Sequence, residues 1–275
     1  MSRFRVNALK QRGSLGAVVR VVSFTLPDRT ALGIPDNVMA FASCPRGLVL
    51  FTGPAGSGKT TTLACIVDQV NSTRNAHVIT IEDPIEHLHQ HKKSVVTQRE
   101  LSTDTRSYDA ALRAALREAP DIILLGEMRD AETIRAAVTA AETGHLVIST
   151  LHTIGAANTI DRIVDSFPPE QQGQIRTQIA LVLEGVVSQT LIPAVDGTLV
   201  PAFEVMTANN AVRNLIRESK AHQLDNVIAQ SAAQGMITLD QSILKLAQAG
   251  RIAPAEALRY CMNPEWLQKR LSAQV

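Results

Sequence analysis

The sequence predicts an α/β fold, a parallel sheet with helices on both faces, from two observations. Short, nearly continuous apolar segments alternate with longer amphipathic segments between residues 47 and 166, and such apolar runs are typical of strands buried on both faces. A glycine-rich turn directly follows the first apolar segment, as at a junction between a strand and a helix. The expected elements are strand Gly47–Phe51, helix Lys59–Val70, strand His77–Ile81, helix Ser107–Arg117, strand Ile122–Leu125, helix Ala131–Thr143 and strand Leu146–Thr150.

The helix expected over Ala131–Thr143 has a single apolar face. Four residues at helical spacing form that face: Ile134, Ala137, Val138 and Ala141. Gly144 follows them, and glycine commonly ends a helix because it adopts the left-handed conformation without strain. A helix of this kind is expected to pack its apolar face on the sheet.

The chain is expected to divide into an N-terminal segment (1–46), the α/β core (47–167) and a C-terminal segment (168–275). In the first segment, apolar residues over Gly16–Val22 are typical of a strand, and residues 27–35, bounded by prolines, are typical of a loop. Neither is part of the alternating pattern of the core.

Residues 168–275 are expected to form a helical subdomain, with a strand-like run only at Leu199–Val200. The sequence Thr238-Leu239-Asp240-Gln241 has the form of a capping box, so a helix is expected from there to Gly250. Pro254 suits the first turn of a last helix.

The composition excludes several classes of protein. A chain of 275 residues with 45% hydrophobic and 19% charged residues is expected to bury a core and not to be disordered. The net charge of +1 and the aromatic content of 3% provide neither the positive groove nor the stacking surface of a nucleic-acid binder, so no nucleic-acid partner is expected. No apolar run approaches the roughly 18 residues of a membrane span. The three scattered cysteines are typical of reduced thiols in a cytoplasmic protein.

The glycine-rich turn is the strongest functional signal in the chain. Residues Gly53-Pro54-Ala55-Gly56-Ser57-Gly58-Lys59-Thr60 satisfy G-x-x-x-x-G-K-[ST], the phosphate-binding loop or Walker A motif. Glycines let backbone N–H groups approach phosphate oxygens, and the N-terminus of the following helix favours negative charge. We expect Lys59 to reach the β- and γ-phosphates of ATP, the Thr60 hydroxyl to bind Mg²⁺ and Thr61 to belong to the same nucleotide site. The alternative is a glycine turn without a ligand, which the flanking strand and helix do not favour.

Two groups of carboxylates are expected beside this loop. Glu82, Asp83 and Glu86 follow the second expected strand, and Glu127 ends the third. Open α/β sheets bind ligands at the carboxyl ends of their strands. Carboxylates placed there hold Mg²⁺ or orient the attacking water. The alternative is that they are capping or solvated acids, above all for Glu86 on its turn.

Histidines occur in two places near this edge. His152 ends the last expected strand of the core, where a neutral imidazole would hydrogen-bond a phosphate, although a purely structural role is an equal alternative. His87, His89 and His91 alternate in a loop and imitate a metal site. No acidic or cysteine partner stands at ligand spacing, so we expect a solvated loop there.

Arginines crowd the first twenty residues, at Arg3, Arg5, Arg12 and Arg20. In multimeric P-loop motors an arginine stabilises the charge that develops on the γ-phosphate. Arg5 and Arg20 are therefore candidates for nucleotide binding, and a solvated surface is the alternative.

Five motifs in a fixed order resemble those of the secretion and pilus ATPase superfamily. They are G-P-x-G-S-G-K-T (Gly53–Thr60), I-E-D-P-I-E (Ile81–Glu86), G-E-M-R-D (Gly126–Asp130), A-A-E-T-G-H-L-V (Ala140–Val147) and T-L-H-T (Thr150–Thr153). Within this superfamily, the segment Ala211–Glu218 is similar to the A-I-R-N-L-I-R-E motif of the twitching-motility retraction ATPases (PilT-like). The resemblance covers nearly the whole chain, and it implies a RecA-like P-loop NTPase core with a C-terminal helical subdomain.

The resemblance also implies a function. It implies a hexameric, ATP-driven motor that depolymerises the type IV pilus at the cytoplasmic face of the inner membrane. The implied partners are further copies of the chain, a pilus platform protein in the inner membrane and homologous ATPase rings. Position by position, it implies a Walker A pair, a catalytic glutamate, a Walker B glutamate that supports the metal, and a histidine box: Lys59 and Thr60, Glu86, Glu127, and His145 with His152.

Two departures from the family pattern are expected to matter. The segment Arg3–Ala8 resembles the end of an N-terminal PAS-like domain whose arginines help to bind nucleotide. Most of that domain is expected to be absent, so 1–46 is interpreted as its remnant and a linker. Ile154-Gly155 follows the histidine box where a more polar pair is usual, which is expected to loosen the position of His152.

Three other functions stay open. A pilus-assembly or type II secretion ATPase is the nearest, but those relatives usually carry paired C-x-x-C zinc motifs, which Cys44, Cys65 and Cys261 do not form. A non-hydrolysing interaction subunit or fragment of such a ring is another, against which the intact Walker motifs argue. A nucleic-acid motor of the RecA type is the third, and charge and composition disfavour it.

Overall fold

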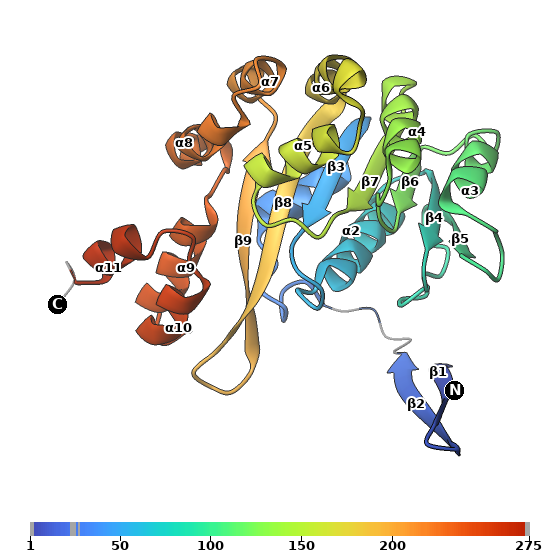
Figure 1. Ribbon diagram of the computed structural model, residues 1–275, viewed down its shortest axis with the longest axis horizontal. Coiled ribbons are helices and arrows are strands. Elements are labelled where there is room, and N and C mark those ends of the chain that lie inside the picture. Colours follow the sequence, from blue (N-terminus) through green and yellow to red (C-terminus); the bar gives the residue numbers. More distant parts are fainter. Residues whose placement is uncertain (1–2, 23–25, 27, 273–275) are drawn as a thin grey trace.

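The computed structural model describes residues 3–22, 26 and 28–272, and its centre is a seven-stranded sheet (Figure 1). The strands lie in the order β5-β4-β6-β7-β3-β8-β9, and every neighbouring pair is parallel except β8 and β9. Their bounds are β3 Gly47–Thr52, β4 His77–Glu82, β5 Val95–Glu100, β6 Ile122–Leu125, β7 Leu146–Thr150, β8 Leu183–Pro193 and β9 Leu199–Thr207. The predicted α/β fold is confirmed.

Helices cover both faces of this sheet. One face is covered by α3 Tyr108–Ala115, α4 Ala131–Glu142, α5 Ala156–Asp165 and α6 Pro169–Val182. The other face is covered by α2 Lys59–Thr73, the short α1 Asp36–Met39 and the 3-10 turn Ala40–Ser43. The helices over Lys59–Val70 and Ala131–Thr143 therefore form as predicted, within a few residues at their ends.

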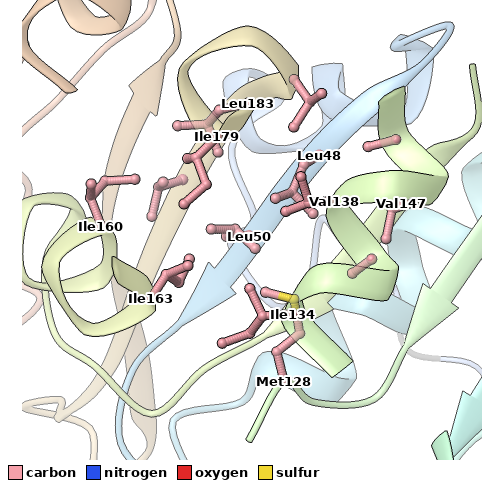
Figure 2. Packing of buried hydrophobic residues seen from close by; sticks show 14 of the residues in the cluster. Leu48, Leu50, Met128, Ile134, Val138, Val147, Ile160, Ile163, Ile179 and Leu183 are labelled. Atoms are coloured by element: carbon pink, nitrogen blue, oxygen red, sulfur yellow. The ribbon is translucent and has the colours of Figure 1, made fainter. Parts of the chain in front are cut away.

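A hydrophobic core lies on each face of the sheet, and β3 contributes side chains to both. Successive side chains of a strand point to opposite faces, so alternate residues of β3 belong to different cores. Leu48 and Leu50 belong to the first core, and Val49 and Phe51 to the second. All four are fully buried. Figure 2 shows Leu48 and Leu50 among side chains of α4, α5 and α6. Helix packing on both faces thus holds β3 in place, and the phosphate-binding loop begins at its end.

The prediction that residues 168–275 contain almost only helices is wrong. After α6 the chain returns to the sheet as β8 and then as β9, so the sheet extends beyond the predicted boundary at 167. In β8, Ser188, Gln189 and Thr190 are buried although they are polar. They interrupt the apolar run by which a central strand is normally recognised. The pattern also misses β5, because an edge strand carries more polar residues.

The rest of the C-terminal region is helical, as predicted. Its helices are α7 Asn210–Arg217, α8 Leu224–Gln230, α9 Leu239–Gln248, α10 Pro254–Tyr260 and α11 Pro264–Ser272, with 3-10 turns at Ala221–Gln223 and Ala232–Gln234. The predicted capping box is present, since the side chains of Thr238 and Gln241 each accept a hydrogen bond from the other residue's backbone N–H. α9, α10 and α11 pack with the distal half of the β8–β9 hairpin in a third hydrophobic cluster, separate from the two cores of the sheet.

The N-terminal segment forms a two-stranded antiparallel hairpin of β1 (Arg3–Gln11) and β2 (Ser14–Val22). This confirms the predicted strand over Gly16–Val22 and adds a partner that the sequence pattern does not predict. One face of the hairpin is apolar and exposed, with Phe4 at 54% and Val19 at 57% exposure. Of the predicted N- and C-terminal segments, residues 1–2, 23–25, 27 and 273–275 lie outside the described residues.

Candidate functional site

The phosphate-binding loop joins β3 to α2 in a conformation suited to glycine. Gly53, Gly56 and Gly58 have φ angles of 135°, 78° and 87°. A β-carbon on Gly53 would lie 2.1 Å from the carbonyl oxygen of Gln189, and one on Gly58 would lie 2.8 Å from Nε2 of the same residue. Gly58 is the N-cap of α2 and has no side chain to cap it. The first backbone N–H groups of the helix are therefore left for an anion.

Lys59 and Ser57 carry polar groups that suit a phosphate. The Lys59 side chain folds back on the loop, where Nζ donates to the carbonyl oxygens of Gly53 at 2.7 Å and Pro54 at 2.9 Å. Burial lowers the pKa of Lys59, and the nearby Glu127 opposes that effect. Ser57 Oγ is buried and has no hydrogen-bond partner among the described residues. A buried hydroxyl without a partner is costly, so the loop is built to receive a further polar ligand.

A cavity of about 680 Å³ opens beside this loop, which is within the usual range for a small-molecule site. It lies at the carboxyl ends of the parallel strands β4, β6 and β7, where ligands bind in open α/β sheets. Predicted residues from the loop, both acidic groups and the end of β7 line it together: Ala55, Gly56, Ser57, Gly58, Lys59, Thr60, Thr61, Glu82, Asp83, Glu86, Glu127 and His152. Segments about a hundred residues apart in the sequence thus meet at one site, as the sheet topology requires.

On the acidic side of the cavity, Glu82 is held tightly while Glu86 is partly exposed. Glu82 Oε1 accepts hydrogen bonds from Thr80 Oγ1 at 2.6 Å and from Gln98 Nε2 at 3.3 Å. Burial nevertheless raises the pKa of Glu82, and the neighbouring Glu86 contributes in the same direction. Hydrogen bonds therefore hold the Glu82 carboxylate in place, and Glu86 lies on the turn after β4, at the edge of the same cavity.

Glu127 and His152 lie side by side because they follow the adjacent strands β6 and β7. His152 Nε2 is 3.4 Å from Glu127 Oε2, and the Arg129 guanidinium pairs with Oε1 of the same carboxylate. The Glu127 side chain is 12% exposed and that of His152 is 59% exposed. The structure thus brings these two predicted residues together, while their catalytic roles stay predictions.

The two candidate arginines of the hairpin differ in position. Arg5 and Arg20 are directly opposite each other in the β1–β2 register. Arg20 lines the cavity, whereas Arg5 is not among the described residues that line it. The structure therefore favours Arg20 as the hairpin residue nearest to a bound nucleotide.

The comparisons with known proteins agree with this geometry. The family model described as "Type II/IV secretion system protein" matches residues 2–259. The chain belongs to this family. A twitching motility protein of Neisseria gonorrhoeae is 50% identical over 96% of this chain and 71% of its own length. A type IV pilus retraction ATPase, PilT, of Pseudomonas aeruginosa is 49% identical over 96% of this chain and 77% of its own length.

A solved structure agrees with this fold. The crystal structure of the pilus retraction motor PilT with bound ADP superposes with a TM-score of 0.89 at 47% identity, covering 97% of this chain and 76% of that one. The resemblance to PilT-like ATPases that the motifs predict is confirmed, and so is the predicted fold class.

Gln189 is a residue of the site that the sequence does not reveal. Its side chain is buried at 4% exposure. Its Oε1 accepts a hydrogen bond from Thr62 Oγ1, on the first turn of α2, at 2.8 Å. Its backbone oxygen lies against Gly53. Gln189 thus packs against the phosphate-binding loop and the first turn of α2. The sequence pattern misses it because the pattern does not predict β8.

Tyr108, His87 and His89 also line the cavity and are missed. The Tyr108 hydroxyl lies 2.9 Å from where a β-carbon on Gly126 would be, and burial raises its pKa. The expectation of a solvated loop is wrong for the two histidines, which are partly buried. Burial lowers the pKa of His87, and it lowers that of His89 to about 4, which favours the neutral imidazole. Within residues 3–22, 26 and 28–272, no group of three or more side chains is arranged to hold a metal ion.

Two motif residues of the family lie outside the cavity. His145 stands at the opposite end of β7, where its Nδ1 is 3.0 Å from the carbonyl oxygen of Ala140 at the end of α4. Arg213, in the segment Ala211–Glu218, donates from Nη1 to the carbonyl oxygens of Ala180 and Leu181, each at 2.9 Å. Both side chains satisfy carbonyl groups near the end of a helix, which is a structural role.

Proposed function

We propose that this chain is an ATP-hydrolysing motor that powers the retraction of type IV pili. The observation that carries the proposal is that Lys59, Glu86 and Glu127 line one cavity. There a phosphate, an attacking water and a metal ion would each meet a suitable side chain. The pilus part of the proposal rests on two relatives, about half identical over 96% of this chain, whose names refer to twitching motility and pilus retraction.

ATP fits the phosphate-binding loop because the loop presents groups that an anion would satisfy. These are the buried Ser57 hydroxyl without a partner among the described residues, the Lys59 ammonium and the first N–H groups of α2. We assign Mg²⁺ to the Thr60 hydroxyl and the Glu127 carboxylate, both of which line the cavity. Mg²⁺ commonly takes few protein ligands, together with water and phosphate oxygens. When bound, it would neutralise negative charge on the β- and γ-phosphates.

The remaining side chains of the site have distinct proposed roles. Glu86 orients the attacking water and accepts its proton. His152, beside Glu127, hydrogen-bonds the phosphate end of the nucleotide and reports its state to the loop after β7. Arg20 stabilises the charge that develops on the γ-phosphate, and Arg5 is the second candidate for that role.

We further propose that the motor works as a homohexameric ring at the cytoplasmic face of the inner membrane. Its partners there are the pilus platform protein and, where present, homologous ATPase rings, and no nucleic acid takes part. None of the helices in the described part of the chain is long and apolar enough to cross a membrane. The solved PilT structure, described as a retraction motor, supports the motor assignment.

The first test is Mg²⁺-ATP hydrolysis as a function of protein concentration, with Lys59→Ala as the blank. Turnover that rises steeply with concentration supports a motor with sites completed by assembly. No turnover above the blank, despite nucleotide binding, refutes hydrolysis and supports the non-hydrolysing subunit instead. Equal turnover in Lys59→Ala refutes the site assignment.

The second test separates retraction from assembly. The chain is expressed in a Pseudomonas aeruginosa strain that lacks its retraction ATPase, and twitching is measured together with surface pili. Restored twitching with fewer surface pili supports retraction. Restored pili in an assembly-deficient strain, with no effect on twitching, would instead support the pilus-assembly alternative.

A further inference from the structure

Glu204 is a buried carboxylate at the seam between two hydrophobic clusters. It lies on β9 and is 5% exposed. Residues two apart on a strand share a face. On one side of Glu204, Met206 belongs to the core under α4, α5 and α6, and on the other side Ala202 belongs to the separate cluster of α9, α10 and α11. A charged group between two apolar cores is costly unless it is hydrogen-bonded, so its partners matter.

The first partner is the N-terminus of α5, next to the nucleotide site. Gly155 is the N-cap of that helix and has no side chain to cap it. Two cross-strand neighbours on the β8–β9 hairpin supply the missing cap. Gly155 N donates to Ser188 Oγ at 3.0 Å, and Ala156 N donates to Glu204 Oε1 at 2.7 Å. Side chains of the sheet thus cap the N-terminus of α5, where Gly155 stands in place of the more polar residue that is usual after the histidine box.

The second partner lies in the C-terminal helices. The backbone N–H of Leu239, the first residue of α9, lies near the Glu204 carboxylate and favours its ionised form. One side chain therefore caps the N-terminus of α5 and faces the N-terminus of α9, and the two helices belong to different clusters. Figure 1 shows the β8–β9 hairpin between α5 and the helices α9, α10 and α11.

The loop between β7 and α5 connects this joint to the catalytic end of the cavity. Thr153 and Thr159 hydroxyls are 2.8 Å apart, and Thr159 Oγ1 donates to the Gly155 carbonyl oxygen at 2.7 Å. His152 precedes Thr153 and contacts Glu127. These contacts join the phosphate end of the cavity to the N-terminus of α5.

We propose that Glu204 is a positioning residue that couples the loop carrying His152 to the helices α9, α10 and α11, so that the nucleotide state of the site reaches the C-terminal subdomain. The inference rests on the proposed function, because it assigns a route for the motion that hydrolysis would drive. Coupling between distant regions can pass through a contiguous set of contacts, and Glu204 lies where the contacts of the two regions meet.

The charge of Glu204 is expected to change with pH near neutrality. Burial raises its pKa to about 7, and the carboxylates of Asp225 on α8 and Asp240 on α9 act in the same direction. The backbone N–H groups of Ala156 and Leu239 oppose them. The α5 and β8 sides present an N–H group and a hydroxyl, which carry no charge. Near neutral pH the carboxylate is therefore only partly ionised, and the strength of its contacts with these two backbone N–H groups depends on pH.

Hydrogen exchange of the whole chain, with and without Mg²⁺-ADP, tests the coupling. In the wild type, ADP should slow exchange both in residues 150–156 and in residues 237–248. In Glu204→Ala, ADP should still slow exchange around the phosphate-binding loop, but it should no longer slow exchange in residues 237–248. In the same variant kcat should fall, with KM nearly unchanged. Glu204→Gln keeps an acceptor oxygen, so it should retain most of the coupling and lose the wild type's dependence on pH around 7.

Two control variants each remove a cap from only one of the two helices, α5 or α9. Ser188→Ala removes a cap of α5 and leaves α9 alone, and Thr238→Ala removes the cap of α9 and leaves α5 alone. Both should keep the ADP-dependent change in 237–248. The proposal is overturned if the wild type shows no such change, or if Glu204→Ala shows it undiminished. The exchange measurement needs only bound ADP, so it tests the coupling even if the chain does not hydrolyse ATP. A lack of hydrolysis would refute the proposed function and leave the coupling to be decided by the exchange data. If Glu204→Ala does not fold, Glu204→Gln decides by its pH dependence.

Discussion

The backbone carbonyl oxygen of Gln189 stands 2.1 Å from the point where a β-carbon on Gly53 would lie. Gln189 belongs to β8 and Gly53 follows β3, and these strands are parallel neighbours. The Gln189 side chain reaches Thr62, 127 residues away in the sequence, with a hydrogen bond of 2.8 Å. The shape of the phosphate-binding loop thus depends on a strand far from it in the sequence.

Replacing Gly53 with alanine should therefore remove nucleotide binding. The added carbon would meet a backbone atom, and the φ of 135° is one that alanine rarely adopts. The loop or β8 must move, which is expected to lower the free energy of unfolding by about 1–3 kcal/mol. Urea denaturation and titration with a fluorescent nucleotide measure the two effects.

Gly144→Ala is the matched control. Gly144 also has a positive φ, 103°, but a β-carbon there would meet nothing within 4 Å in the described part of the chain. It should lose only about 1–2 kcal/mol from the unfavourable conformation and bind nucleotide normally. Normal binding by Gly53→Ala would contradict the argument from Gln189.

Replacing Glu86 with glutamine should separate binding from turnover. If Glu86 accepts the proton of the attacking water, kcat should fall about 10²–10⁴-fold while the Kd for ATP is unchanged. Steady-state kinetics and a binding titration check both. Glu82→Gln is the comparison, because Glu82 is held by Thr80 and Gln98 and should change kcat much less. An equal loss in both variants would show that the assignment of the base to Glu86 is wrong.

Much of the core is predictable from local patterns. β6 and β7 have the predicted bounds, Ile122–Leu125 and Leu146–Thr150, because strands buried on both faces read as apolar runs with sharp ends. The phosphate-binding loop and Glu127 follow directly from such runs, so their place at one edge of the sheet follows from the topology of a parallel sheet.

The parts that the sequence does not predict depend on contacts between distant segments. Gln189 and Glu204 are polar residues inside strands of the core, where their burial is offset by partners in other elements. Nothing in a local pattern distinguishes such residues from exposed ones. In the same way, the choice between Arg5 and Arg20 depends on how the hairpin lies against the cavity, and not on the spacing of the arginines.

Substitutions in the sheet and in the hairpin should differ strongly in their effect on stability. Ile123 of β6 is fully buried, so Ile123→Ala should lower the free energy of unfolding by about 2–5 kcal/mol. Val19 of β2 is 57% exposed, and Val19→Ala should change the free energy by no more than about 0.5 kcal/mol. Urea denaturation of both variants checks this contrast. A large loss in Val19→Ala would mean that the apolar face of the hairpin is covered in solution.

Glu204→Gln should change how stability depends on pH. Burial raises the pKa of Glu204 from its ordinary 4.5 to about 7. Between these values the folded protein keeps a proton that the unfolded chain has released, so this group lowers wild-type stability as the pH rises through the window and has no further effect above it. Glutamine does not titrate. The free energy of unfolding of Glu204→Gln, relative to the wild type, should therefore increase from below pH 4.5 to above pH 7, by up to about 3 kcal/mol. Urea denaturation at pH values below, within and above this window measures the difference. Parallel curves for the two proteins would mean that the pKa of Glu204 is the same in the folded and the unfolded chain, so that favourable contacts to its carboxylate fully offset burial.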